Sequence, residues 1–387
     1  MNSGLPAHQT AGEGWAAAAA ACPKRMRYGP CAGVLDGDGD GDDRDGDRDG
    51  AAGNTEERHG VGACEVPGFG PCAFLPVLAD GWRPGRLPEP PPTGAPLNPA
   101  AAAARSAAGR RALIVADLPA PPCSGAGLRA SAAELSGVVD ACLLGDHGGA
   151  RVQFPPSYRA RLMAEAGVGA WVGINCRDRN RVALDGELAA CADAGAVAVH
   201  CVTGDHQALG HRPDSPGVFD LDSLELVALA AGRGMLCSVA HAPTARPRPT
   251  RLPRLLAKAR AGADVVFVDH CGGPGPVGAA VAALRAAGFA GLVLACVPVV
   301  TDAATAAVVA SFAADRLPPG HLAAILGADD PAAAGIAATI ELALATAALP
   351  GVDGVNLSGG TEPGQELTAA RALGTVGRQL RERLPAG

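Results

Sequence analysis

Short apolar runs, many of them β-branched, recur along most of the chain after residue 110. They lie at 112–117, 138–144, 170–174, 196–202, 234–240, 264–268, 291–297 and 353–358. Because the runs are apolar throughout rather than alternating, they are typical of parallel strands that are covered on both faces. Segments with helical spacing separate them, and several of these end in glycine, as helices often do. The eight runs predict a (β/α)8 TIM barrel over 111–387, with a doubly wound α/β sheet as the alternative.

Two further regions precede the predicted barrel. Residues 81–110 are rich in Pro and Ala with little apolar periodicity, which predicts a stiff, extended linker. Residues 1–80 carry several cysteines and little apolar mass, which predicts a small cysteine-rich metal-binding module. The acidic run within 34–60 resembles a calcium loop only loosely, because Asp47 stands where a glutamate ligand belongs. We expect a disordered insertion there.

Length and composition restrict the class of protein. The chain has 387 residues, of which 48% are hydrophobic and 18% charged, enough for a large core. The net charge of −7 offers no basic face for nucleic acid. Apolar stretches of the roughly 18 residues that a membrane-spanning helix needs do not occur. We therefore expect a cytoplasmic protein that binds neither nucleic acid nor a membrane.

The N-terminal module contains four cysteines at two places in its sequence, Cys22 with Cys31 and Cys64 with Cys72. In a reducing compartment clustered cysteines favour metal binding over disulfides. Four thiolates suffice for a tetrahedral zinc ion or an iron–sulfur cluster. The alternative is that they are unligated thiols in a small core.

Lysine is rare in this chain, which contains only Lys24 and Lys258 against thirty arginines. Lys24 lies between Cys22 and Cys31, where its ammonium group would offset the negative charge of metal-bound thiolates. We therefore expect Lys24 to serve the metal–thiolate site.

Polar residues follow the predicted strands. The set comprises Asp117, Asp146, His147, Asn175, Thr203, Gly204, Asp205, His206, His241, Asp269, His270, Asn356, Ser358, Gly359 and Gly360. In TIM barrels the chemistry takes place at the C-terminal ends of the strands, so these side chains would converge on one rim. Each of them alone could be a helix cap, but together they predict a small-molecule site.

Several of these stretches resemble one enzyme family. The segments "GINCRDRNRVALDGELAACADAGAVAVHCVTGD" and "GVFDLDSLELV" resemble the methylenetetrahydrofolate reductase family, in particular its branch with a CRDRN motif. "RLLAKARAGADVVFVD", "GLVLACVPVVT" and "GVDGVNL" are similar to that family's later strands, so the resemblance covers 110–380. "CPKRMRYGPCAG" with "CEVPGFGPC" resembles the small cysteine-rich domain that accompanies some of these reductases.

The resemblance implies a barrel with FAD at the strand ends. Its activity would be flavin-dependent reduction of 5,10-methylenetetrahydrofolate to 5-methyltetrahydrofolate, or of a related C1-pterin, in one-carbon metabolism and methionine biosynthesis. The electron donor would be NAD(P)H or a reduced donor protein that the cysteine module docks or serves. The implied flavin-binding residues are Asn175, Thr203, Gly204, Asp205 and Lys258, the last beside the flavin's phosphates.

The same resemblance implies the catalytic roles and also shows departures from the family. Asp117 would supply the proton, while Asp205 and Asp269 would hold the pterin. However, Asp117 replaces a family glutamate, Asp269 replaces a glutamine, and Gly173 replaces a histidine. These departures leave open a catalytically degenerate folate-binding or methyl-handling barrel.

Two other questions stay open at this point. A metal-dependent hydrolase that uses His147, His206, His241 and His270 is a weaker alternative, because the first strand carries no paired histidine ligands. A homo-oligomer is also compatible with the sequence.

Overall fold

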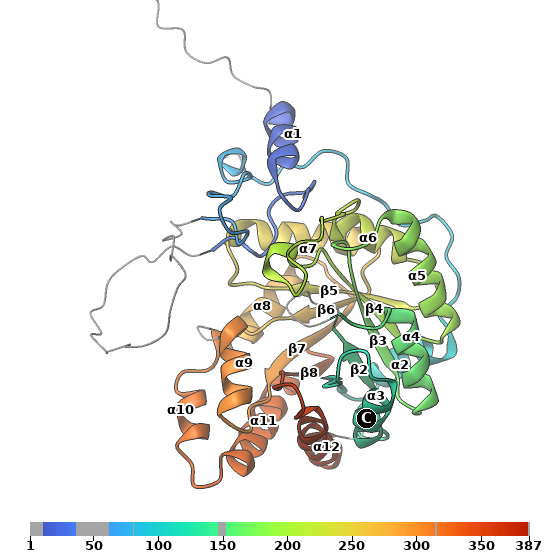
Figure 1. Cartoon of the computed structure of the whole chain (residues 1–387), viewed down its shortest axis with the longest axis vertical. Coiled ribbons are helices and arrows are strands. Elements are labelled where there is room, and N and C mark those ends of the chain that lie inside the picture. Colours follow the sequence, from blue (N-terminus) through green and yellow to red (C-terminus); the bar gives the residue numbers. More distant parts are fainter. Residues whose placement is uncertain (1–10, 36–61, 80, 146–151, 314–315, 386–387) are drawn as a thin grey trace, which may run out of the picture.

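The computed structural model describes residues 11–35, 62–79, 81–145, 152–313 and 316–385. Its centre is a closed barrel of eight parallel strands that follow one another in sequence order (Figure 1). The strands are β1 (Leu113–Asp117), β2 (Ala141–Leu144), β3 (Ala170–Asn175), β4 (Ala198–Val202), β5 (Leu236–His241), β6 (Val265–Val268), β7 (Leu292–Pro298) and β8 (Gly354–Ser358). The predicted (β/α)8 TIM barrel is confirmed.

Helices surround the barrel. They are α3 (Gly125–Leu135), α4 (Pro156–Glu165), α5 (Arg181–Asp193), α6 (Ser223–Ala230), α7 (Arg251–Arg260), α8 (Pro274–Ala286), α9 (Ala303–Ala313), α10 (His321–Leu326), α11 (Pro331–Ala347) and α12 (Glu366–Arg383), with short 3₁₀ turns η2 (Gln207–Leu209) and η3 (Arg248–Thr250). Local capping sets two of their starts. Asn180 accepts a hydrogen bond from the Ala183 amide at 3.0 Å, and Asp222 with Glu225 forms a capping box at α6.

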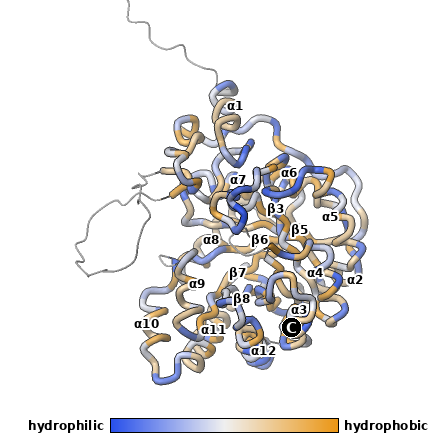
Figure 2. Tube along the Cα trace, viewed as in Figure 1, coloured by the Kyte–Doolittle hydropathy of each residue, from blue (hydrophilic) through white to orange (hydrophobic). Residues whose placement is uncertain are grey.

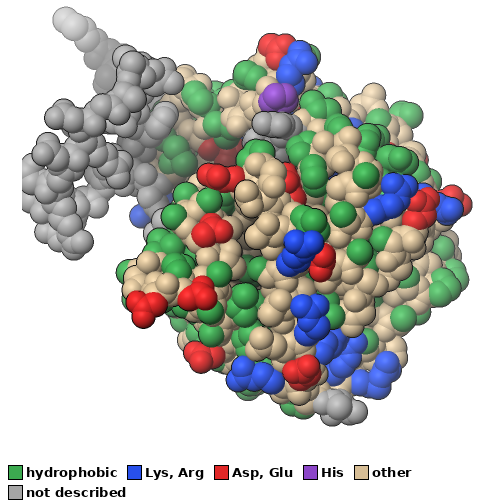
Figure 3. Space-filling view, turned by 60° about the horizontal axis from the view of Figure 1, so that its bottom comes forward, with side chains coloured by type: hydrophobic (Ala, Val, Ile, Leu, Met, Phe, Trp, Pro, Cys, Tyr) green, Lys and Arg blue, Asp and Glu red, His purple; other side chains and the backbone are tan. Residues whose placement is uncertain are grey.

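Alternate residues of each strand face two different cores, which explains the continuous apolar runs. In β1, Ile114 and Ala116 pack outward against the helices, while Leu113 and Val115 pack inside the barrel. The strands at the centre of the molecule accordingly carry much hydrophobic colour in Figure 2. Figure 3 shows acidic, basic and hydrophobic side chains interspersed on one face of the molecule.

The region 81–110 is not extended over its whole length, in contrast to the prediction. Helix α2 (Pro99–Ala108) begins at Asn98, whose side chain accepts a hydrogen bond from the Ala101 amide at 2.8 Å. Ala101 and Ala104 are buried against the inner core of the barrel. Alanine favours helix, and a helix lets these small side chains close the barrel's N-terminal end, so the segment adopts one.

The N-terminal segment packs beside α6 and α7 (Figure 1). It consists of α1 (Ala11–Ala21), η1 (Pro76–Leu78) and irregular chain around a small core with Trp15, Met26 and Phe74. Val34 forms backbone bridges to Cys64 and to Arg246 of the barrel. Most of the predicted acidic insertion, residues 36–60, lies outside the described residues.

No helix in the part of the chain that the structure describes combines the length and the apolar character needed to cross a membrane.

Candidate functional site

A cavity of about 810 Å³ opens at the C-terminal ends of the strands. The connections that follow β1, β2, β7 and β8 supply most of its wall, and apolar residues such as Leu118, Phe154 and Leu373 line much of it. Four charged side chains are among the described lining residues: Asp117, Arg159, Asp205 and Glu366. The cavity therefore has the size and mixed lining of a small-molecule site.

Asp117, at the end of β1, is the best-supported reactive group in this cavity. Its Oδ1 accepts a hydrogen bond from Asn356 Nδ2 at 3.1 Å, and its Oδ2 accepts one from the Gly359 amide at 3.3 Å. Burial raises the pKa of Asp117 to about 6, outweighing these hydrogen bonds, and the nearby charge of Asp269 acts in the same direction. The carboxyl group can thus hold or release a proton near neutral pH.

The negative charge of Asp269 contributes to the raised pKa of Asp117, but Asp269 does not line the cavity. Its Oδ2 is 2.9 Å from Arg316 Nη1, and its Oδ1 accepts a hydrogen bond from the His270 amide at 2.9 Å. The His270 ring in turn lies 2.7 Å from Ser358 Oγ. The carboxylate of Asp269 therefore ties the connection after β6 to the one before α10, and its predicted contact with a pterin stays a prediction.

Among the residues predicted to bind the flavin, only Asp205 lines the cavity. Asn175 Oδ1 accepts a hydrogen bond from the Arg177 amide at 2.9 Å, and Thr203 Oγ1 accepts one from the Ser223 amide at 3.2 Å. Gly204 has φ +88°, and a Cβ there would lie 3.0 Å from the Cβ of Asn175. These residues pack against each other where β3 and β4 end, and glycine is required for that close approach.

Lys258 lies on α7 and is also absent from the cavity lining. Burial, together with the positive charge of Arg254, lowers the pKa of Lys258 to about 8. Two arginines on the same helix form hydrogen bonds with the backbone of the N-terminal segment. Arg254 Nη1 donates to the carbonyl oxygens of Tyr28 and Gly29 at 2.7 and 2.5 Å, and Arg251 Nη2 donates to that of Cys31 at 2.8 Å.

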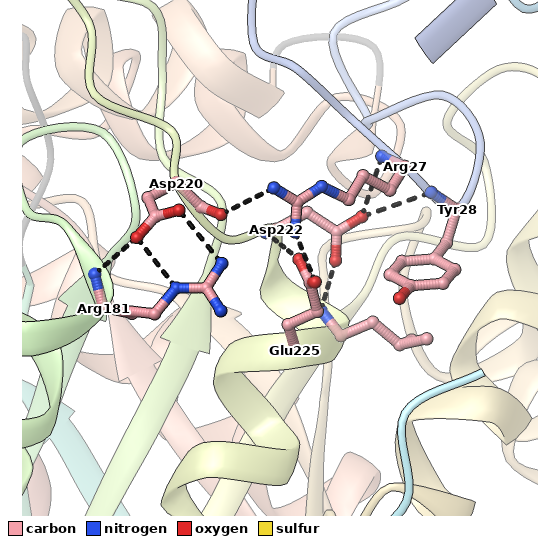
Figure 4. A network of polar contacts seen from close by, with 7 residues as sticks. Arg27, Tyr28, Arg181, Asp220, Asp222 and Glu225 are labelled. Carbon is pink, nitrogen blue, oxygen red and sulfur yellow. Dashed lines mark hydrogen bonds and ion pairs between the residues drawn. The ribbon is translucent and has the colours of Figure 1, made fainter. Parts of the chain in front are cut away.

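A second set of contacts holds the same loop on α6 (Figure 4). Arg27 forms an ion pair with Glu225 and donates from Nη2 to the carbonyl oxygen of Asp220 at 2.8 Å. Asp222 Oδ2 accepts hydrogen bonds from the amides of Arg27 and Tyr28, both at 3.3 Å. Side chains and backbone of the barrel thus fix residues 27–31 at its rim.

The four N-terminal cysteines are free thiols that lie near each other. Burial raises the pKa of Cys72 to about 11, and the negative charges of Cys31, Cys22 and Cys64 add to this rise. Within the described residues, however, no group of three or more His, Cys, Asp or Glu side chains is arranged to hold a metal ion. The described part of the module thus shows no formed metal site, and zinc or an iron–sulfur cluster stays a prediction for it.

Lys24 forms a buried ion pair with Glu65. Burial alone would lower the pKa of Lys24, but the negative charges of Cys31 and Glu65 outweigh it and the pKa is raised, with Asp205 adding to the effect. The negative charge of Asp205, which lines the cavity, therefore acts on Lys24 in the cysteine segment. The sequence alone did not indicate this interaction.

Of the flavin site that the resemblance implies, Asp205 alone lines the cavity. Lys258, the predicted partner of the flavin phosphates, is outside the cavity lining, and the two arginines beside it on α7 are bonded to backbone oxygens of the N-terminal segment. FAD therefore stays a prediction.

Residues that sequence reasoning missed complete the site. Arg159 projects from α4 into the lining of the cavity, Glu366 begins α12 at its edge, and Arg316 pairs with Asp269. No motif marks these residues, because each is an isolated charge in a long connection or a helix. The hydrolase alternative gains no support, since His206, His241 and His270 belong to no metal-binding group among the described residues and His147 lies outside them.

Comparison with known proteins identifies no family. No family model and no curated protein matches the chain. Similar solved structures include an uncharacterized protein from Clostridium thermocellum that binds two copies of 5-methyl-5,6,7,8-tetrahydrofolic acid. It is 10% identical, with 72% of this chain and 99% of that chain covered and a TM-score of 0.49.

Two other similar structures bind or act on different molecules. A tryptophan synthase from M. tuberculosis is 16% identical, with 73% of this chain and 98% of that chain covered and a TM-score of 0.41. 2,3-Dimethylmalate lyase, a PEP mutase/isocitrate lyase superfamily member, is 13% identical, with 73% and 82% covered and a TM-score of 0.41. Likenesses this remote carry no argument about function.

Proposed function

We propose that this protein binds a reduced folate carrying a one-carbon unit in the cavity at the barrel mouth. The observation that carries the proposal is the Asp117 carboxyl group, with a pKa of about 6, on the wall of a cavity of about 810 Å³. The resemblance to the methylenetetrahydrofolate reductase family supplies the class of ligand.

The cavity lining suits the parts of a reduced folate. A pterin ring presents an amino group and a ring N–H on one edge, and a carboxylate such as that of Asp205 can accept hydrogen bonds from both. The apolar side chains of Leu118, Phe154 and Leu373 offer surface for the flat ring systems. The same lining would disfavour a highly charged polyphosphate ligand, because three of its four described charges are negative.

Reduction of 5,10-methylenetetrahydrofolate is the reaction that the resemblance implies. In it the five-membered ring opens, the one-carbon unit gains a hydride to become the N5 methyl group, and N10 gains a proton. Asp117 is suited to donate that proton, since a carboxyl group with a pKa of about 6 is partly protonated near neutral pH. Asp205 would orient the pterin, and no step is assigned to a flavin. NAD(P)H could supply the hydride directly, whereas a reduced donor protein that gives single electrons would need the flavin between it and the folate.

A second candidate is folate binding without reduction. One observation favours it: Arg251 and Arg254 of α7 hold the N-terminal segment, and Lys258 on the same helix does not line the cavity. In that case the protein would store or present a methyl- or methylene-folate.

The experiment uses the full-length protein purified without air. Its absorbance reports bound flavin, calorimetry reports binding of 5-methyltetrahydrofolate, and oxidation of NADH or reduced ferredoxin is followed with 5,10-methylenetetrahydrofolate. Reductive turnover supports the first candidate, and binding without turnover supports the second. A folded protein that binds neither folate would contradict both.

A further inference from the structure

Asn356 on β8 is buried beside Asp117, and one end of its side chain has no hydrogen-bond partner among the described residues. The residue is 1% exposed and does not line the cavity. Its Nδ2 donates to Asp117 Oδ1 at 3.1 Å and to Cys296 Sγ at 3.9 Å, so both amide protons are engaged. Its Oδ1, in contrast, is buried and unpaired. An acceptor in that state costs free energy, so its presence beside a reactive carboxyl group needs a reason.

An asparagine side chain can present either end to the same neighbour. Its oxygen and nitrogen are nearly alike in size, and its last torsion has a broad, roughly two-fold profile. A half-turn of the Asn356 carboxamide would therefore place Oδ1 where Nδ2 lies, facing Asp117 and Cys296. Nδ2 would then become the unpaired end. Each orientation thus has one engaged end and one unpaired end.

The protonation state of Asp117 decides which end is needed. An ionised carboxylate only accepts hydrogen bonds, so an N–H must face it, whereas a protonated carboxyl group can donate its O–H to Oδ1 of Asn356. The Gly359 amide already donates to Asp117 Oδ2 at 3.3 Å, which leaves Oδ1 of Asp117 to carry the proton. Burial raises the pKa of Cys296 well above its ordinary value, so its thiol keeps a proton that it can donate to the same amide oxygen.

Other titratable groups near Asp117 do not take this role. The negative charge of Asp269, after β6, acts on Asp117, but its own oxygens are engaged by Arg316 and by the His270 amide. Burial and the charge of Asp117 raise the pKa of Cys142 on β2, so this thiol stays neutral. Asn356 is therefore the side chain that must adapt when Asp117 gains or loses its proton.

We propose that Asn356 is a positioning residue that holds Asp117 in both of its protonation states, by turning its carboxamide over when Asp117 takes up or releases a proton. Nδ2 faces the ionised carboxylate, and Oδ1 faces the protonated carboxyl group. The turn follows from the contacts of Asp117, whereas its part in the reaction rests on the proposed function. In that reaction Asn356 would keep the carboxyl group in one place before and after its proton passes to N10 of the folate.

NMR of the full-length protein tests the turn without any ligand. The side-chain amide protons of Asn356 are observed at about pH 5 and about pH 8, on either side of the Asp117 pKa of about 6. We expect nuclear Overhauser contacts from these protons to the β-protons of Cys296 at the higher pH. We expect their loss at the lower pH, because Nδ2 then lies at the other end of the side chain. The same contacts at both pH values would overturn the inference.

Asp117→Asn separates the turn from a general effect of pH. An amide at position 117 neither gains nor loses a proton over this range, so the contacts of the Asn356 amide should be the same at both pH values. A pH-dependent change that persists in this variant would also overturn the inference.

A second variant tests the contact itself. Asn356→Leu removes it, and we expect the midpoint of the Asp117 carboxyl titration, followed by carbon NMR, to rise by about 0.5 to 1 pH unit, because a hydrogen bond to a charged group is stronger than one to a neutral group. Cys142→Ala, which removes a buried neutral neighbour on β2, is the matched control and should leave the midpoint in place. An unchanged midpoint in Asn356→Leu would contradict the proposal. None of these measurements uses a folate, so their failure would leave the proposed function standing.

Discussion

The two sides of the barrel mouth use their charged side chains in different ways. Over α6 and α7, Arg251 and Arg254 donate to backbone oxygens of residues 28–31 and hold the N-terminal segment in place. Beside β1 and β8, Asp117 has a raised pKa and lines a cavity. The first side closes the rim, and the second leaves it open to a ligand.

This difference shows that residue type alone does not identify a ligand site. The sequence suggests Lys258 and its helix as a phosphate site, yet the cations next to it are part of the fold. The proposed reactive group lies on the side where a carboxyl group, rather than a cation, meets the cavity.

The largest expected effect is on catalysis, on the open side. We expect Asp117→Asn to lower turnover of 5,10-methylenetetrahydrofolate by about 100-fold or more, because an amide cannot supply the proton. Steady-state kinetics with a saturating donor measures it, and binding of 5-methyltetrahydrofolate should change less than about 3-fold. Glu362→Gln, an exposed carboxylate in the connection after β8, is the control. Unchanged turnover in Asp117→Asn would remove Asp117 from the reaction.

On the closed side the largest effect is on stability. Arg254 is 6% exposed and donates to two carbonyl oxygens of the N-terminal segment. Arg254→Ala leaves both oxygens without this partner, and we expect a loss of about 3 kcal/mol in the free energy of unfolding. Chemical denaturation measures it, and limited proteolysis should cut the N-terminal segment faster. Arg260→Ala, exposed at the end of the same helix, should change neither. Wild-type stability in Arg254→Ala would show that the segment does not depend on α7.

The raised pKa of Asp117 predicts how stability depends on pH. The folded protein binds more protons than the unfolded chain between the ordinary pKa of 3.8 and about 6, so Asp117 makes stability fall as pH rises through this window. We expect the whole fall to amount to about 3 kcal/mol, of which about 2 kcal/mol occurs between pH 4.5 and pH 7. Denaturation at pH 4.5 and pH 7 measures it, and Asp117→Asn should lack this part of the dependence. The same pH dependence in both proteins would contradict a raised pKa.

The smallest expected effect is at the edge of the closed side. The Arg27 side chain is 39% exposed, so its ion pair with Glu225 is partly screened by solvent. Arg27→Ala also removes the hydrogen bond to the Asp220 carbonyl, and we expect a loss of about 1 kcal/mol in the free energy of unfolding. Thermal denaturation measures it against Arg86→Ala, an exposed position in the region 81–110. A loss as large as that of Arg254→Ala would mean that the outer contacts carry the docking.

Much of the fold was predictable, because the apolar runs record burial on both faces of each strand. The position of Asp117 and Asp205 on the cavity wall was predictable as well, because both residues follow parallel strands whose C-terminal ends meet at one rim. The surroundings of Lys258 were not, because they depend on contacts between α7 and a loop more than two hundred residues away in sequence. Helix α2 was missed because Ala101 and Ala104 are buried by contacts with the barrel. A run of alanines has too little contrast between apolar and polar positions to indicate such burial.

The central claim is that the cavity beside Asp117 binds a reduced folate. Ala369 on α12 lines this cavity, whereas its neighbour Thr368 is exposed and does not. Calorimetry with 5-methyltetrahydrofolate on Ala369→Trp and Thr368→Trp tests the claim most directly, because a tryptophan at 369 would fill the space. We expect binding to wild-type protein and to Thr368→Trp but not to a folded Ala369→Trp. Undiminished binding to Ala369→Trp would contradict it.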